Sequence, residues 1–149
     1  MPHGTDDDAN PTARRAFNRV ESPVAPDARD PEPAQSASQL LANRPNRIGH
    51  GILAAGDPVL MEKLREAGIV LQICPTSNLL TKALPNEEAI RTTLRAFVEH
   101  GVAFTIATDG PEMMGTHLRD ELELLERIGA LTETELSEAN ARGHAASFI

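Results

Sequence analysis

The fold is decided by the stretch Gly68-Ile-Val-Leu-Gln-Ile-Cys-Pro75. Residues 69–74 are apolar apart from one glutamine, and they are typical of a buried β-strand. The strand ends at Pro75, because proline has no N–H to donate to a neighbouring strand. The class of fold then depends on what lies on either side of this strand.

A helix is predicted on each side of it. Asp57 can cap the first helix, Pro58 suits its first turn, and Gly68 ends it. Asn86 can cap the second, which Gly101 ends. Each helix has one apolar face, made by Val59, Leu60, Leu64 and Ala67 in the first and by Ile90, Leu94, Phe97 and Val98 in the second.

Two further strands and two further helices complete the pattern. Residues 47–49 could end a short strand, and residues 102–108 form the next one. A third helix follows, with the charged residues of 121–126 on its solvated face. Thr132 and Glu135 have capping-box spacing and start a last helix. The core stripe of the third helix is expected to contain Leu118, Leu122, Leu125 and Ile128.

The alternation of strands and helices predicts an α/β fold with a parallel sheet and crossover helices. Three strands are few for such a fold, because a parallel sheet is normally covered on both faces and its edges need partners. The pattern therefore favours part of a larger α/β structure.

The beginning of the chain differs from the rest. Residues 1–45 hold seven of the eleven prolines and the acidic run 6–8, with few large apolar side chains. Such a segment buries too little surface to offset its ordering entropy. We expect residues 1–45 to be Pro-rich and largely disordered, apart from a short helix near 37–43, and residues 46–149 to form the folded domain.

Composition excludes several classes of function. The net charge of −8 argues against a nucleic-acid partner, since phosphate binding needs clustered Lys and Arg. No apolar run approaches the roughly 20 residues of a membrane span, and the N-terminus lacks signal-peptide features. The single cysteine, Cys74, excludes an internal disulfide and a multi-cysteine metal site. We therefore expect a cytoplasmic protein that binds neither membrane nor nucleic acid.

Candidate site residues follow the predicted strands, at the end where parallel α/β folds place their sites. His50 lies between two glycines and could act as a base or as an electrostatic partner of a bound water, or could simply be a hydrogen-bonded histidine at a strand–loop junction. Asp109 could bind a metal or cap a turn. Cys74 is expected to be a small buried residue. No site role is expected for the other histidines, His3, His100, His117 and His144.

These segments, taken in order, resemble the adenosine deaminase family of metal-dependent hydrolases. The resemblance covers residues 47–149 and includes the final helix. It implies that the chain contains the C-terminal strand–helix units of a (β/α)8 TIM-type barrel, incomplete here and preceded by a disordered tail. The matching motifs are Arg47-Ile-Gly-His-Gly51, Cys74-Pro-Thr-Ser-Asn-Leu79 and Phe104-Thr-Ile-Ala-Thr-Asp-Gly-Pro111.

The resemblance also implies a chemistry. Members of the family bind zinc through a His-x-His pair, a third His and an Asp, which Asp109 matches. His50 matches the strand-end His that orients and helps activate the zinc-bound water. The reaction removes an amino group from a purine by hydrolysis, with a Glu acting as acid and base.

Part of that apparatus does not occur in this sequence. It contains no His-x-His pair, and a Pro-rich run at 25–35 stands where the family's His-Ala-Gly-Glu motif, with the third His and the Glu, is expected. Gly110 replaces a second Asp that often contacts the purine, which leaves the exact substrate open. Zinc is expected in the complete family site and to bind this chain alone weakly or not at all.

Two functional hypotheses follow. In the first, the chain is a fragment of a zinc-dependent adenosine/adenine-type deaminase, inactive alone, that acts on a purine nucleoside or base when a missing half completes it. In the second, it is a catalytically dead deaminase-like module that binds a partner or forms a homo-oligomer that closes its own sheet. A third possibility is a reading frame whose product folds poorly and has no function.

Overall fold

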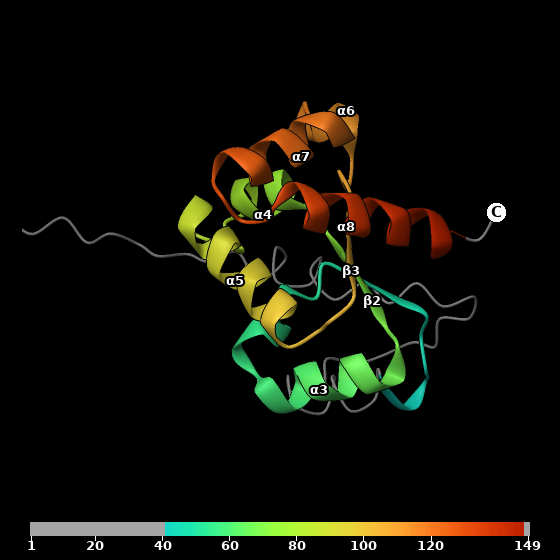
Figure 1. Cartoon of the computed structure of the whole chain (residues 1–149). Helices are drawn as coiled ribbons and strands as arrows, with labels where there is room; N and C mark the ends of the chain where they lie inside the picture. The colour runs from blue at the N-terminus through green and yellow to red at the C-terminus, as the bar shows by residue number, and fades with distance from the viewer. Residues whose placement is uncertain (1–40, 148–149) are drawn as a thin grey trace, which may run out of the picture.

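The computed structural model describes residues 41–147, which form three parallel strands alternating with helices (Figure 1). The strands are β1 (Arg47–Gly49), β2 (Val70–Ile73) and β3 (Phe104–Ile106), in the spatial order β1-β2-β3. The predicted α/β class and parallel sheet are therefore confirmed. β2 is the central strand, and β1 and β3 are the edge strands of the sheet within this part of the chain.

β2 and β3 begin later than predicted because the ends of the preceding helices take up the first residues of each predicted strand. At the start of β2, the Ile69 N–H bonds to the Leu64 carbonyl at 3.1 Å and so still belongs to the end of the preceding helix. At the start of β3, the Val102 N–H bonds to the Phe97 carbonyl at 2.9 Å in the same way.

Helices α3 (Pro58–Ala67) and α5 (Glu87–Glu99) begin and end as predicted. The Asp57 carboxylate accepts a hydrogen bond from the Leu60 N–H at 3.0 Å, and the Asn86 side chain accepts one from the Ala89 N–H at 2.9 Å. Gly68 follows α3 with a φ of 66°, a left-handed conformation that favours glycine.

Three short helices were not predicted: η2 (Ile52–Gly56), α4 (Pro75–Leu80) and α6 (Pro111–Met114). Two of them begin with a proline, which the sequence had indicated only as a strand end or a turn. A proline suits the first turn of a helix equally well, because the N–H groups there have no partner within the helix. The two prolines therefore start α4, two residues after β2, and α6, five residues after β3.

The last two helices are α7 (Leu118–Arg127) and α8 (Glu133–Ala145). The predicted capping box of α8 is present, since the Thr132 N–H donates to the Glu135 carboxylate at 2.8 Å and the Thr132 hydroxyl accepts from the Glu135 N–H at 3.3 Å. Figure 1 shows α8 crossing β3, against which it packs.

The solvated face predicted for α7 is wrong at one residue. Glu121 has no exposed surface, whereas Leu118, expected in the core, is 41% exposed. Glu121 lies one helical turn before Leu125, which is fully buried, so the two side chains share a face of α7. The core stripe therefore contains a carboxylate.

The core lies between the sheet and its covering helices. Leu71 of β2 and Leu94 and Phe97 of α5 are completely buried, and the rings of Phe97 and Phe104 lie 6.3 Å apart between centroids. Arg95 Nη1 donates to both oxygens of the Glu135 carboxylate, at 2.9 and 3.0 Å, and joins α5 to the start of α8.

Expectations for residues 1–40, including most of the predicted helix at 37–43, lie outside the described residues. Within residues 41–147, no helix combines the length and the apolar character that crossing a membrane requires.

Candidate active site

The three predicted segments lie at the carboxyl edge of the sheet. His50 follows β1, α4 begins two residues after β2, and Asp109 stands three residues after β3. Since the strands are parallel and adjacent, these segments leave the same edge. In Figure 1, α4, α6 and α7 gather at this end of the sheet.

His50 is held in a buried, left-handed turn. Its side chain is only 7% exposed, and φ is 58° at His50 and 68° at Gly51. Two consecutive residues of this kind turn the chain sharply out of β1, and the conformation is costly for a residue other than glycine. The turn is anchored to β2, because the His50 N–H donates to the Gln72 carbonyl at 2.8 Å.

The imidazole of His50 is oriented by α4. Its Nδ1 lies 2.9 Å from Asn78 Oδ1, and both side chains are buried. An amide oxygen only accepts hydrogen bonds, so Nδ1 carries the proton in this arrangement. In the neutral imidazole, Nε2 is then the ring nitrogen with the lone pair, and it lies 3.8 Å from Asp109 Oδ2.

Asp109 is the more exposed residue of the pair that it forms with His50. Its side chain is 46% exposed, and Oδ2 lies 3.8 Å from His50 Nε2. Ser77 Oγ donates a hydrogen bond to the same oxygen at 3.0 Å. Asp109 also has a left-handed backbone, with φ of 67°. The structure thus brings the two sequence-predicted site residues together across the intervening strand.

Ser77 and Asn78 are site residues to which the sequence analysis gave no role. Both lie in α4 and are almost completely buried, and they bond to Asp109 and His50 respectively. The signal in the sequence was a pair of polar residues soon after the carboxyl end of a buried strand. That signal indicated a site, but not which partner each side chain would take.

Cys74 is buried between the sheet and this site. Burial, together with the nearby carboxylates of Asp109 and Glu121, raises the pKa of its thiol to about 12. The thiolate is the reactive form of cysteine, and it is scarce near neutral pH at such a pKa. The geometry agrees with the interpretation of Cys74 as a small buried residue.

Three of the four histidines that were given no site role lie elsewhere, and the fourth, His3, falls outside the described residues. The His100 ring bonds to the Ala96 carbonyl at 2.9 Å at the end of α5, and His117 caps α7, where its N–H donates to the Asp120 carboxylate at 2.7 Å. His144 lies in the last turn of α8.

The fit of the site to zinc is partial. Zinc sites use three or four protein ligands, drawn from His, Cys, Asp and Glu. Among residues 41–147, no three such side chains lie close enough together to hold a metal ion. The half-exposed carboxylate of Asp109 is a suitable single ligand with an oriented imidazole beside it. The residues present therefore fit one part of a zinc site.

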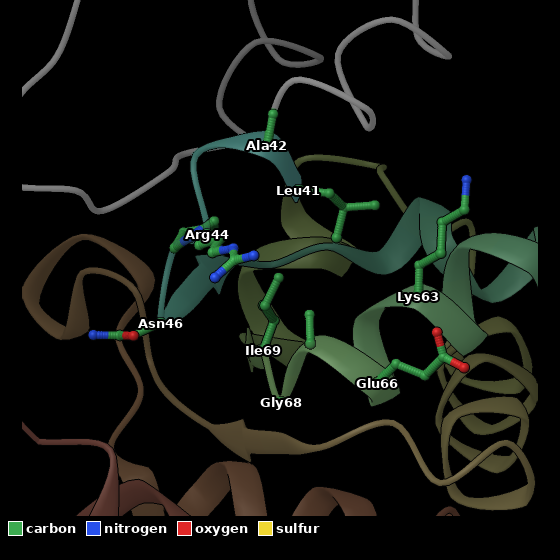
Figure 2. Close-up of a pocket in the computed structure, with 10 residues that line it drawn as sticks. Leu41, Ala42, Arg44, Asn46, Lys63, Glu66, Gly68 and Ile69 are labelled. Carbon is green, nitrogen blue, oxygen red and sulfur yellow. The ribbon is translucent and has the colours of Figure 1, made fainter.

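A separate hollow of about 860 Å³ lies at the opposite end of β1 and β2 (Figure 2). Its lining comes from the residues that precede the two strands and from α3, including Arg44, Asn46, Lys63, Glu66 and Ile69. None of the residues that meet at the carboxyl edge lines it, so it is distinct from the candidate site.

Comparison with known proteins gives a family match over most of the chain. The family model described as adenosine deaminase matches residues 15–149. The match begins upstream of the first motif, which starts at Arg47. Similar proteins include an aminodeoxyfutalosine deaminase of Streptomyces coelicolor, 39% identical over 110 residues. An adenosine deaminase of Pectobacterium atrosepticum is 37% identical over 103 residues, and an adenine deaminase of Rhizobium leguminosarum bv. trifolii is 34% identical over 113 residues.

These alignments cover much of this chain and little of the relatives. They include 74%, 69% and 76% of this chain, but 28%, 30% and 34% of the respective relatives. The chain thus spans about a third of the length of the curated relatives that it matches.

Proposed function

Because the chain belongs to the adenosine deaminase family, we propose that residues 46–149 supply the closing strand–helix units of a (β/α)8 barrel and one corner of a purine deaminase active site. Asp109 is the zinc ligand of this corner, and His50 is the catalytic residue beside it. The observation that carries the proposal is the 3.8 Å distance between His50 Nε2 and Asp109 Oδ2. These atoms come from strands that are not neighbours, at the edge of the sheet where sites form.

The hydrogen bonds around the pair support these roles. Asn78 keeps the proton of His50 on Nδ1, so Nε2 is the atom that accepts a proton next to Asp109. Ser77 donates to one oxygen of Asp109 and so orients the carboxylate at the mouth of the site. Zinc bound in such a site makes a hydroxide available near neutral pH.

The remaining groups of the reaction come from residues that this sequence does not contain. A His-x-His pair and a His-Ala-Gly-Glu motif are both absent from the 149 residues. The polypeptide alone therefore holds too few ligands for a closed zinc site and has no partner for the purine ring nitrogen. We propose that it has no deaminase activity until polypeptide carrying those groups completes the barrel.

The substrate class is a purine amino compound of the adenosine/adenine type. The three relatives above are named for three different substrates, so family membership alone does not choose among them. Gly110 stands where the family resemblance implies a purine-contacting Asp. Without that carboxylate, the contact to the purine has to come from another part of the barrel.

A chimera tests the proposal directly. The aligned C-terminal segment of the Streptomyces coelicolor relative is replaced by residues 47–149 of this chain, and loss of the substrate amino group is followed by ultraviolet absorbance. We expect zinc-dependent turnover that falls by about 10²–10⁴-fold in His50→Ala, the usual contribution of a positioned acid or base. Asp109→Ala should lose both bound zinc and turnover.

One control variant and one outcome of the chimera decide between the hypotheses. Glu123→Ala alters an exposed carboxylate of α7 and should leave turnover unchanged. A chimera that folds and binds zinc but is inactive would contradict the proposal and favour the alternative, a deaminase-like binding or oligomerising module.

A further inference from the structure

Glu121 of α7 is a buried carboxylate to which the proposed mechanism gives no role. Its side chain has no exposed surface, and Oε2 accepts a hydrogen bond from the Thr76 N–H at 3.0 Å. Burial raises the pKa of Glu121, while hydrogen bonds from Thr76 and Thr116 act in the opposite direction. A leucine would fill such a position without the cost of removing a carboxylate from water.

The hydrogen bond to Thr76 stabilises the start of α4. The first N–H groups of a helix have no partner within the helix and are usually satisfied by the side chain of the capping residue. In α4 the capping residue is Cys74, whose side chain makes no capping hydrogen bond. The Glu121 carboxylate, from a helix 45 positions later in the chain, takes that place.

The same turn of α4 contains the two residues that bond to Asp109 and His50. Thr76 is followed directly by Ser77, which bonds to Asp109, and by Asn78, which bonds to His50. A rotation or shift of this turn would therefore move both hydrogen bonds together. Because Glu121 anchors this turn, it also sets the distance between Asp109 and His50.

We propose that Glu121 is a positioning residue of the site, which acts through the Thr76 N–H to hold Ser77 and Asn78 against Asp109 and His50. The use of this arrangement in deamination rests on the proposed function, but the arrangement itself does not. Glu121 thus does more than pack between α7 and α4.

Nuclear magnetic resonance of the 149-residue chain tests this without zinc, substrate or turnover. The readouts are the Thr76 amide proton shift, the exchange rate of that amide, and the ring ¹⁵N shifts of His50. Glu121→Met removes the acceptor, and Glu121→Gln keeps a carbonyl oxygen in its place. Leu125→Ala, on the same buried face of α7, is the control for lost packing alone.

We expect Glu121→Met to move the Thr76 amide shift upfield, to speed its exchange by about tenfold or more, and to shift both ring nitrogens of His50. Glu121→Gln and Leu125→Ala should each keep the wild-type Thr76 and His50 values. Unchanged Thr76 and His50 signals in Glu121→Met, or equal shifts in Leu125→Ala, would overturn the proposal.

Should Glu121→Met fail to fold, Glu121→Gln decides alone. His50 ring shifts that match the wild type support positioning through the hydrogen bond, and displaced shifts overturn it. An inactive chimera would leave these results untouched, so the failure of either proposal can be told from the failure of the other.

Discussion

At the scale of single residues, the carboxylate of Glu121 links the site to the pH dependence of stability. Burial raises the pKa of this group above its ordinary value of 4.5. A carboxyl group whose pKa is raised by folding stabilises the fold fully below its unfolded pKa, and this contribution is lost as the pH rises through the folded pKa. Ionisation of Glu121 therefore works against the folded state.

We predict that Glu121→Gln becomes more stable relative to the wild type as the pH rises from about 4.5 to about 8. The amide stays neutral over this range, whereas the buried carboxyl of the wild type ionises. Urea unfolding of both proteins at several pH values gives the difference in free energy. A difference that is constant with pH, or that shrinks as the pH rises, would show that Glu121 has no raised pKa.

The residues that carry chemistry could be predicted from the sequence to different degrees. His50 and Asp109 could be found because each directly follows a strand signal and is followed by a glycine. The roles of Ser77 and Asn78 depend on which strand ends face α4, which is a tertiary property. Glu121 could have been found, since its helical spacing from Leu125 places it on the apolar face. Its charge alone led to the prediction that its side chain faces solvent.

At the scale of elements, the close packing of α8 on β3 depends on a glycine. A Cβ atom at Gly143 would lie 2.6 Å from Thr105 Oγ1, closer than real contacts allow. Thr105 is buried in β3, so its side chain has little room to move away. The absence of a side chain at Gly143 lets the helix approach the strand.

We predict that Gly143→Ala destabilises the chain by about 1–2 kcal/mol, because overpacking outweighs the gain of about 1 kcal/mol that alanine brings to a helix. Thr105→Ala removes the atom that would clash, so the double variant should recover most of the loss. Gly56→Ala is the matched control, because its Cβ would meet nothing within 4 Å. Thermal unfolding measures all four proteins, and a stabilised Gly143→Ala variant would contradict this packing.

The elements themselves were largely predictable because their signals are local. Asp57, Asn86 and Thr132 start helices through hydrogen bonds to residues three positions later, and the long apolar runs give strands. The short helices η2, α4 and α6 were missed because they depend on the turn that each strand end makes. Two of the three, α4 and α6, begin at a proline. In the sequence, the same proline is equally consistent with the end of a strand or with a turn.

At the scale of the whole molecule, residues 41–147 form a sheet of three strands, and the chain spans about a third of the length of its relatives. The parallel sheet was predictable from the alternation of strands and helices. The barrel was not, because three strands within residues 41–147 do not close a barrel. Its assignment rests on family membership.

We predict that the 149-residue chain alone binds zinc more weakly than about 1 μM, because one carboxylate leaves the ion mostly hydrated. Isothermal titration calorimetry of the metal-free chain measures this affinity. Asp109→Ala is the control, and it should titrate like the wild type. Stoichiometric submicromolar binding that disappears in Asp109→Ala would mean that the chain closes a zinc site by itself.

The central claim is that the ends of β1 and β3 form one corner of a zinc deaminase site. A crystal structure of the zinc-loaded chimera, with anomalous data collected at the zinc edge, tests it most directly. We predict one zinc peak bonded to the Asp109 carboxylate at about 2.0–2.2 Å, with His50 close by and its Nδ1 on Asn78. A zinc peak remote from Asp109, or His50 and Asp109 at opposite ends of the sheet, would contradict it.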